Sequence, residues 1–146
     1  IFNTSNTILR EFQQSGKIPP NLALMTHQAD IQKRYEHAFL VMNLSLPDQC
    51  IESFALTVLE GMAHGCPCIV PPVGGHLSYF DGGSGLICDA RNTDEIVAFI
   101  QTLREDRAMW RQHSDHAQKA ASKLTASQYS SNVKKILDQI IAPSEI

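Results

Sequence analysis

Two carboxylates, Glu52 and Glu60, stand eight residues apart, on either side of the point where a helix is expected to begin. The backbone amides of Phe54, Ala55 and Leu56 would fall in the first turn of that helix, where an amide has no partner within the helix. Such amides point, with the positive end of the helix dipole, at whatever lies beyond the turn. A diphosphate is the ligand that this arrangement favours.

The two carboxylates would flank a ligand bound at these amides. Glu52 would accept hydrogen bonds from hydroxyl groups beyond the phosphate, and Glu60, about two turns further along, from vicinal hydroxyls such as those of a ribose. Ser53 is small and would leave the site open. A nucleotide sugar carries these groups. At this point a purely structural role stays open as well, because acidic side chains near a helix start are common and stabilise the dipole.

Short apolar runs alternate with helical stretches along the chain, and this alternation positions the two carboxylates. Strands are predicted over residues 22–25, 39–44, 68–70 and 86–88, of which 39–44 reads as a strand buried on both faces. Helices are predicted over residues 6–15, 31–37, 54–64, 95–103, 107–124 and 127–141. The pattern indicates an α/β fold, a three-layer Rossmann-like domain with a mostly parallel sheet.

The loop with Glu52 would follow the strand over 39–44, at the carboxyl edge where open parallel sheets bind ligands. In the helix after it, Leu56, Leu59 and Ala63 recur every three to four residues and predict the face that packs on the sheet. The buried residues expected in the helix over 95–103 are Ile96, Val97, Phe99 and Ile100.

A second pattern follows the two glutamates in register. Residues 43–75 read NLSLPDQCIESFALTVLEGMAHGCPCIVPPVGG and resemble the signature region of glycosyltransferase family 4, whose members are retaining enzymes with the GT-B fold. That family carries two glutamates at the same spacing, then a glycine, a proline and a double glycine. The matching residues are Glu52, Phe54, Leu56, Leu59, Glu60, Met62, Ala63, Gly65, Pro67, Gly74 and Gly75. The resemblance extends over about residues 21–103.

The resemblance implies a transferase that moves a sugar from a nucleoside diphosphate sugar to a hydroxyl acceptor with retention, in polysaccharide or glycoconjugate synthesis. It implies that Glu52 is catalytic and contacts the donor sugar near its anomeric carbon, and that Glu60 binds the ribose. Ala55 replaces the usual glycine and would add a methyl group beside the donor. The implied donor-binding residues are Glu52, Ser53, Phe54, Ala55, Leu56, Glu60 and, near the base, Thr26.

The resemblance also has implications for cofactors and for a second domain. The family uses no obligatory metal and no other cofactor, and meets the charge of the leaving diphosphate with a helix terminus and basic side chains. Residues 1–16 contain no arginine–lysine pair of the kind the family places early in this domain. We therefore expect residues 1–146 to be one donor-binding domain, truncated at its start and inactive alone, with the acceptor-binding amino-terminal domain as its missing partner.

The composition of the chain bears on its binding partners, its location and the state of its cysteines. The net charge of −3 without a basic block argues against nucleic acid. No apolar run is long enough to span a membrane and no signal-like segment follows Ile1, so we expect a cytoplasmic protein. Peripheral association of the full-length enzyme with the inner face of the membrane is a further expectation. The four cysteines match no zinc pattern and are expected to be buried, reduced thiols: Cys50, Cys66, Cys68 and Cys88.

Other interpretations stay open on the sequence alone. The same scaffold would suit a sugar-nucleotide epimerase-like enzyme of the GT-B kind or a nucleotide-sugar-binding module without catalysis. His113 and His116 lie three residues apart on a predicted helix, near Asp115, at a spacing that permits metal binding. A solvated polar face fits them better, because no third ligand is evident. We predict no metal site.

Overall fold

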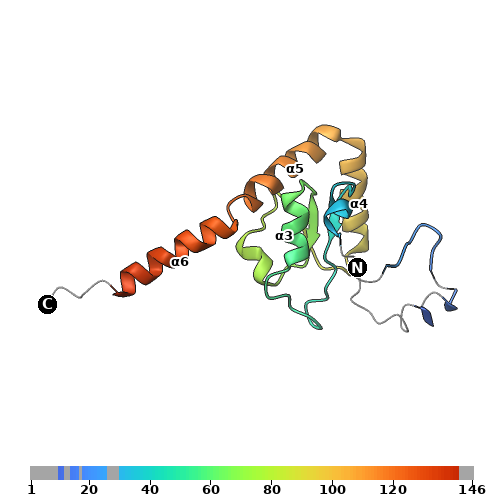
Figure 1. Cartoon of the computed structure of the whole chain (residues 1–146). Coiled ribbons are helices and arrows are strands. Elements are labelled where there is room, and N and C mark those ends of the chain that lie inside the picture. Colours follow the sequence, from blue (N-terminus) through green and yellow to red (C-terminus); the bar gives the residue numbers. More distant parts are fainter. Residues whose placement is uncertain (1–9, 12–13, 17, 26–29, 142–146) are drawn as a thin grey trace. The chain divides into compact units, whose positions relative to one another are not determined.

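Three short parallel strands form an open sheet in the computed structural model of this protein, in the order β1-β2-β3 (Figure 1). β1 covers Val41–Met42, β2 covers Cys68–Val70 and β3 covers Gly85–Ile87. In the register of the sheet, Cys68 is paired with Val41 on one side and with Gly85 on the other. β2 is therefore the central strand of the sheet in the described part of the chain.

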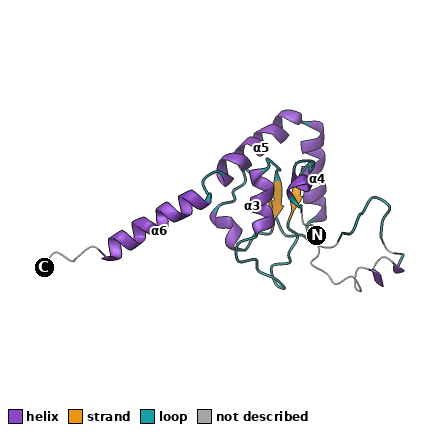
Figure 2. Cartoon of the chain, in the orientation of Figure 1, coloured by secondary structure: helices purple, strands orange, loops and turns teal. Residues whose placement is uncertain are grey.

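From α2 onward, helices and strands come in the predicted order along the chain. Figure 2 shows helices packed beside the strands. The 3-10 helix η1 connects β2 to β3, and α4 and α5 are separated by the single residue Asp106, whose carboxylate accepts 2.9 Å hydrogen bonds from the amides of Ala108 and Met109. Such capping stabilises a helix start by about 1 kcal/mol. The bounds are α2 Gln32–Tyr35, α3 Leu56–Ala63, η1 Gly75–Ser78, α4 Thr93–Glu105, α5 Arg107–Ala121 and α6 Ala126–Ile141.

The sheet has helices on both faces, because alternate residues of the fully buried β2 point in opposite directions. Cys68 and Val70 belong to a core cluster with Val58 and Met62 of α3 and with Ala117 and Ala121 of α5. Ile69 belongs to a second cluster with Ile96 of α4. The arrangement of helices, sheet and helix confirms the prediction of a three-layer α/β domain with a parallel sheet.

The chain divides into two compact units, Ile1–Arg34 and Tyr35–Ile146, and the sheet lies in the second. In the first unit the predicted strand over residues 22–25 is wrong, because these residues are irregular and the side chain of Leu22 is 48% exposed. Most of the helix predicted over 6–15 lies outside the described residues. The structure describes residues 10–11, 14–16, 18–25 and 30–141.

The strand predicted over 39–44 is real but shorter, and it is not buried on both faces. Met42 is 47% exposed and Leu44 is 45% exposed. β1 lies at an edge of the described sheet, so it lacks the second neighbour that buries β2.

The sheet-facing side of α3 also differs from the prediction. Val58 and Met62 are fully buried, whereas Leu56 is 61% exposed. Both sets of residues follow a helical spacing, so periodicity alone does not choose between them. In α4 the prediction holds for Ile96, but Val97 is half exposed.

The cysteines are free thiols, and three of them are buried as predicted: Cys66, Cys68 and Cys88. The prediction is wrong for Cys50, which is exposed. The helix α6 buries no residue, and most of its apolar side chains are exposed, including Ile136 and Ile140. Within the described residues, no helix has the length and apolar character needed to cross a membrane.

Replacement of Gly85 by alanine tests the close contact of β2 and β3. A Cβ atom at Gly85 would lie 1.9 Å from the carbonyl oxygen of Cys68, and the φ angle of +150° disfavours any side chain. We expect Gly85→Ala to lower the free energy of unfolding by about 3 kcal/mol or more, measured by urea denaturation. Gly82→Ala is the control, because a Cβ atom there meets nothing within 4 Å. Equal stability of the two variants would contradict this packing.

Candidate functional site

The loop between β1 and α3 carries most of the predicted site residues and is held by the glycine pair after β2. The amide of Gly75 donates a 2.9 Å hydrogen bond to the carbonyl oxygen of Glu52. A Cβ atom at Gly75 would lie 1.6 Å from the carbonyl oxygen of Ser53, so only glycine permits this approach. The double glycine of the sequence pattern therefore brings the loops that follow β1 and β2 together at one edge of the sheet.

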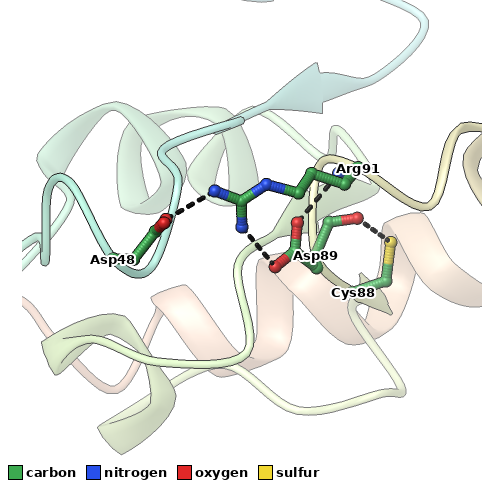
Figure 3. A network of polar contacts seen from close by, with 4 residues as sticks. All are labelled: Asp48, Cys88, Asp89 and Arg91. Carbon is green, nitrogen blue, oxygen red and sulfur yellow. Dashed lines mark hydrogen bonds and ion pairs between the residues drawn. The ribbon is translucent and has the colours of Figure 1, made fainter.

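A second contact joins the same loop to the segment after β3 (Figure 3). The guanidinium of Arg91 lies 2.6 Å from the carboxylate of Asp48 and 3.3 Å from that of Asp89. The hydrogen bond from Arg91 lowers the pKa of Asp48. Arg91 and Asp48 are solvent-exposed and Asp89 is partly exposed, so we expect the network to shape the loops and to add little to the stability of the fold. All three strands thus contribute loops at their carboxyl ends.

α3 begins at Leu56, so of the three predicted amides only that of Leu56 lies in the first helical turn, and those of Phe54 and Ala55 precede the helix. No hydrogen bond within the described part of the chain has its donor at the amide of Phe54, Ala55 or Leu56. Ala55 precedes the helix without a side-chain cap, and its carbonyl accepts from the amide of Val58 at 3.0 Å. The end of the helix can therefore donate to an external anion.

Ala55 has a left-handed backbone, with φ of 56° and ψ of 61°. A residue other than glycine in this conformation costs about 1–3 kcal/mol, which gives a physical reason for the glycine usual at this position. Ala55 is only 7% exposed and belongs to the core cluster with Val58 and Phe80. The expectation that its methyl group lies beside the donor stays a prediction.

Tyr79, after η1, holds the strained part of the loop. Its hydroxyl shares its one hydrogen between the carbonyl oxygens of Phe54, at 2.5 Å, and Ala55, at 3.0 Å, and its ring lies 5.2 Å from that of Phe54. Burial, with smaller contributions from Cys68 and Glu52, raises the pKa of Tyr79 to about 12. Sequence reasoning missed Tyr79, because nothing in its spacing connects it to Phe54.

Glu60 extends from the exposed side of α3, and a buried tyrosine contacts it. The hydroxyl of Tyr35, a residue only 5% exposed, donates to Oε2 of Glu60 at 3.0 Å. Tyr35 lies 25 residues upstream of Glu60. Sequence reasoning missed this residue as well, since the pair meets only in the folded chain.

The fully buried His76 stabilises the segment between β2 and η1, which contacts the loop before α3. Its Nε2 lies 2.9 Å from the carbonyl oxygen of Pro71, so Nε2 carries the hydrogen that makes this bond. Its Nδ1 has no partner within the described residues. His76 thus links the end of β2 to η1, the segment that presents Gly75 and Tyr79.

The structure brings Glu52 to Leu56 together in one turn, and Glu60 follows one helical turn later. In this turn Ser53, Phe54 and Leu56 are exposed, Glu52 is half-buried and Ala55 is buried. The remaining predicted residue, Thr26, lies outside the described residues, so its prediction is untested.

The histidines considered for a metal site are engaged elsewhere. Nδ1 of His113 lies 2.8 Å from the carbonyl oxygen of Gly83, and Nε2 of His116 lies 3.1 Å from the carboxylate of Asp81. Both contacts hold the turn before β3 against α5. Among the described residues, no group of three or more histidine, cysteine, aspartate or glutamate side chains is arranged to hold a metal ion.

A cavity of about 480 Å³ lies between the segment after η1 and the second half of α5. Its wall includes Tyr79, His116, Lys119 and Lys123. None of the predicted donor-binding residues lines this cavity. Of the residues described above as hydrogen-bonded to the loop before α3, only Tyr79 also lines this cavity.

Comparison with known proteins identifies the family. Residues 4–106 match the family of group 1 glycosyl transferases. The chain belongs to this family. The match confirms the glycosyltransferase resemblance that the segment around Glu52 and Glu60 indicated.

Relatives of known activity and structure agree with this assignment. A poly(glycerol-phosphate) alpha-glucosyltransferase of Bacillus subtilis is 24% identical over 130 residues, which are 88% of this chain and 19% of that protein. A sucrose-phosphate synthase of Zea mays is 26% identical over 87 residues, 59% of this chain and 8% of that protein. The crystal structure of Anabaena Alr3699/HepE in complex with UDP-glucose has a TM-score of 0.75 at 20% identity, covering 91% of this chain and 36% of that one.

The structural comparison shows a shared fold, and the coverages show that this chain is much shorter than the proteins it matches. The chain spans less than a fifth of the two relatives of known activity and about a third of the Anabaena protein. It therefore corresponds to one part of each longer protein.

Tyr79→Phe tests the loop contact, because it keeps the ring and removes the hydroxyl. We expect the free energy of unfolding to fall by about 1 kcal/mol at neutral pH, measured by urea denaturation. The pKa of Tyr79 is raised from 10.0 to about 12 in the folded chain, so the unfolded chain loses this proton first as the pH rises. The stability advantage of the wild type over Tyr79→Phe should be full below pH 10 and shrink towards pH 12. A difference that is constant over this range would contradict the assignment.

Proposed function

We propose that this chain binds the nucleoside diphosphate sugar of a glycosyltransferase at the turn formed by residues 52–56 and at Glu60. The observation that carries this proposal is the group of amides at Phe54, Ala55 and Leu56, which donate no hydrogen bond within the described residues and lie between two acidic residues. Family membership supports the reaction class. Crystals of the Anabaena protein with UDP and with UDP-glucose make a uridine nucleotide the first donor to test.

In this proposal the amides of the turn bind the diphosphate and Glu60 binds the ribose hydroxyls. Glu52, whose carbonyl is held by Gly75, presents its half-buried side chain to the sugar near the anomeric carbon. Hydrogen bonds to hydroxyl groups from an ionised carboxylate are stronger than those from neutral acceptors. We propose that the sugar passes to a hydroxyl acceptor with retention and without a metal or other cofactor.

The negative charge of the diphosphate must be offset for the sugar to leave. The end of α3 supplies the equivalent of about half a positive charge, which does not balance a diphosphate. We expect cationic side chains outside the turn to supply the rest and to stabilise the leaving group. The acceptor would be held by a second domain, so that the isolated chain binds donor weakly and does not turn over.

Glu60→Ala tests the ribose contact. We expect the affinity of the chain for UDP or GDP to fall by about 1.5–3 kcal/mol, because a charge-assisted hydrogen bond is lost. Calorimetry on the 146-residue chain measures it. Glu105→Ala, at the end of α4, is the matched control for the change in charge and should leave the affinity unchanged. Equal affinity of Glu60→Ala and wild type would remove Glu60 from the site.

Glu52→Ala separates the sugar site from the nucleotide site. In the chain joined to its acceptor-binding domain, we expect transfer to be abolished while the affinity for the free nucleotide stays close to that of the wild type. Transfer is measured as sugar incorporated from the labelled donor, and affinity by calorimetry. Loss of both properties would assign Glu52 to the nucleotide, and retention of transfer would remove its catalytic role.

A further inference from the structure

We infer that Tyr35 is a positioning residue for the nucleotide: its buried hydroxyl holds the carboxylate of Glu60 in the orientation that accepts hydrogen bonds from the two ribose hydroxyls. Because Glu60 binds the ribose only in the function proposed above, Tyr35 has this role only if that function holds.

Glu60 needs such support because it extends from an exposed helix surface. A glutamate side chain has three rotatable bonds, and fixing it costs up to about 2 kcal/mol of conformational free energy. A contact that fixes the side chain before the ligand arrives removes part of this cost from binding. The hydroxyl of Tyr35, 3.0 Å from Oε2, is the side-chain contact to this carboxylate in the described part of the chain.

Tyr35 is itself held on several sides, so it can serve as a fixed reference for Glu60. Its side chain is 5% exposed, and its ring lies 5.4 Å from that of His64. The thiol of Cys66 donates to its carbonyl oxygen at 3.4 Å. His64 in turn donates from Nδ1 to the carbonyl oxygen of Glu60 at 2.8 Å. The ring, the backbone and the hydroxyl of Tyr35 are therefore all tied to the segment that begins with Glu60.

The chemistry of the pair leaves room for the ribose. An ionised carboxylate has about four acceptor positions on its two oxygens, and Tyr35 occupies one of them. Oε1 and the second position of Oε2 remain for two vicinal hydroxyls. Burial and the neighbouring carboxylate raise the pKa of Tyr35, so it stays a protonated donor at neutral pH and does not compete with Glu60 as an acceptor.

Tyr35→Phe separates positioning from packing, because it removes the hydroxyl and keeps the ring beside His64. The dissociation constants of UDP and GDP for the 146-residue chain are measured by NMR titration, each beside its 2′,3′-dideoxy analogue. We expect about a fivefold loss of affinity for the nucleotide with a ribose and no loss for the dideoxy analogue. Tyr129→Phe, at a residue that is 72% exposed on α6, is the matched control and should change neither.

A double variant sharpens the assignment. If Tyr35 acts through Glu60, Tyr35→Phe should have no further effect on affinity in the Glu60→Ala background. If Tyr35 only packs against His64, Tyr35→Phe should lower the affinity for the ribose nucleotide and for its dideoxy analogue equally, with or without Glu60. That result, or unchanged affinity in Tyr35→Phe, would overturn the inference and leave the proposed function standing.

Two further measurements on the wild-type chain separate a failure of the proposed function from a failure of the positioning role. Wild-type chain that binds neither UDP nor GDP would overturn the proposed function and the role of Tyr35 with it. The side-chain rotamer of Glu60 in the wild type, measured by three-bond NMR couplings, needs no variant and so remains informative if Tyr35→Phe does not fold. A single rotamer is expected, and averaging over several would overturn the positioning role.

Discussion

The candidate site depends on a backbone contact between two loops. Gly75 approaches the chain at Glu52 and Ser53 so closely that a single methyl group would overlap a carbonyl oxygen. Its amide donates to the carbonyl oxygen of Glu52, so the turn before α3 is set by the loop after β2. Because backbone atoms make this contact, the contact itself does not depend on side-chain rotamers. The buried His76 then fixes the loop that carries Gly75.

A pair of tyrosines supports the residues that the proposed function uses. Tyr79 bonds the carbonyls of Phe54 and Ala55, where the chain adopts a left-handed conformation that alanine disfavours. Tyr35 bonds the carboxylate of Glu60. Both tyrosines have a raised pKa, with burial as the largest cause, so both remain hydrogen-bond donors at neutral pH. Strain in the turn is thus balanced by contacts from outside it, as is common where a backbone is shaped for a ligand.

The predictions for individual elements were right where the local sequence pattern determines which residues are buried. They were wrong where contacts with distant segments of the chain determine it. The strand over 68–70 is found with its predicted bounds, because a central strand is buried on both faces and its apolar run reflects that directly. The run over 22–25 has a similar composition and forms no strand, because pairing depends on a partner that sequence does not specify. In α3, Val58 and Met62 compete with Leu56 at the same helical spacing, and only packing against the sheet and α5 selects the buried pair.

The sequence by itself determined the family, the order of elements and the turn of acidic residues and amides, because each lies within one continuous segment. The spacing of Glu52 and Glu60 and the later double glycine are local features that hydrogen bonding and helix geometry constrain directly. Only the tertiary structure decided which residues surround that turn. Three side chains reach this region from at least 25 residues away in the sequence: Tyr35 contacts Glu60, Tyr79 contacts Phe54 and Arg91 contacts Asp48. The pairing of the strands brings these segments together. Such contacts follow from the path of the whole chain, which no local pattern contains.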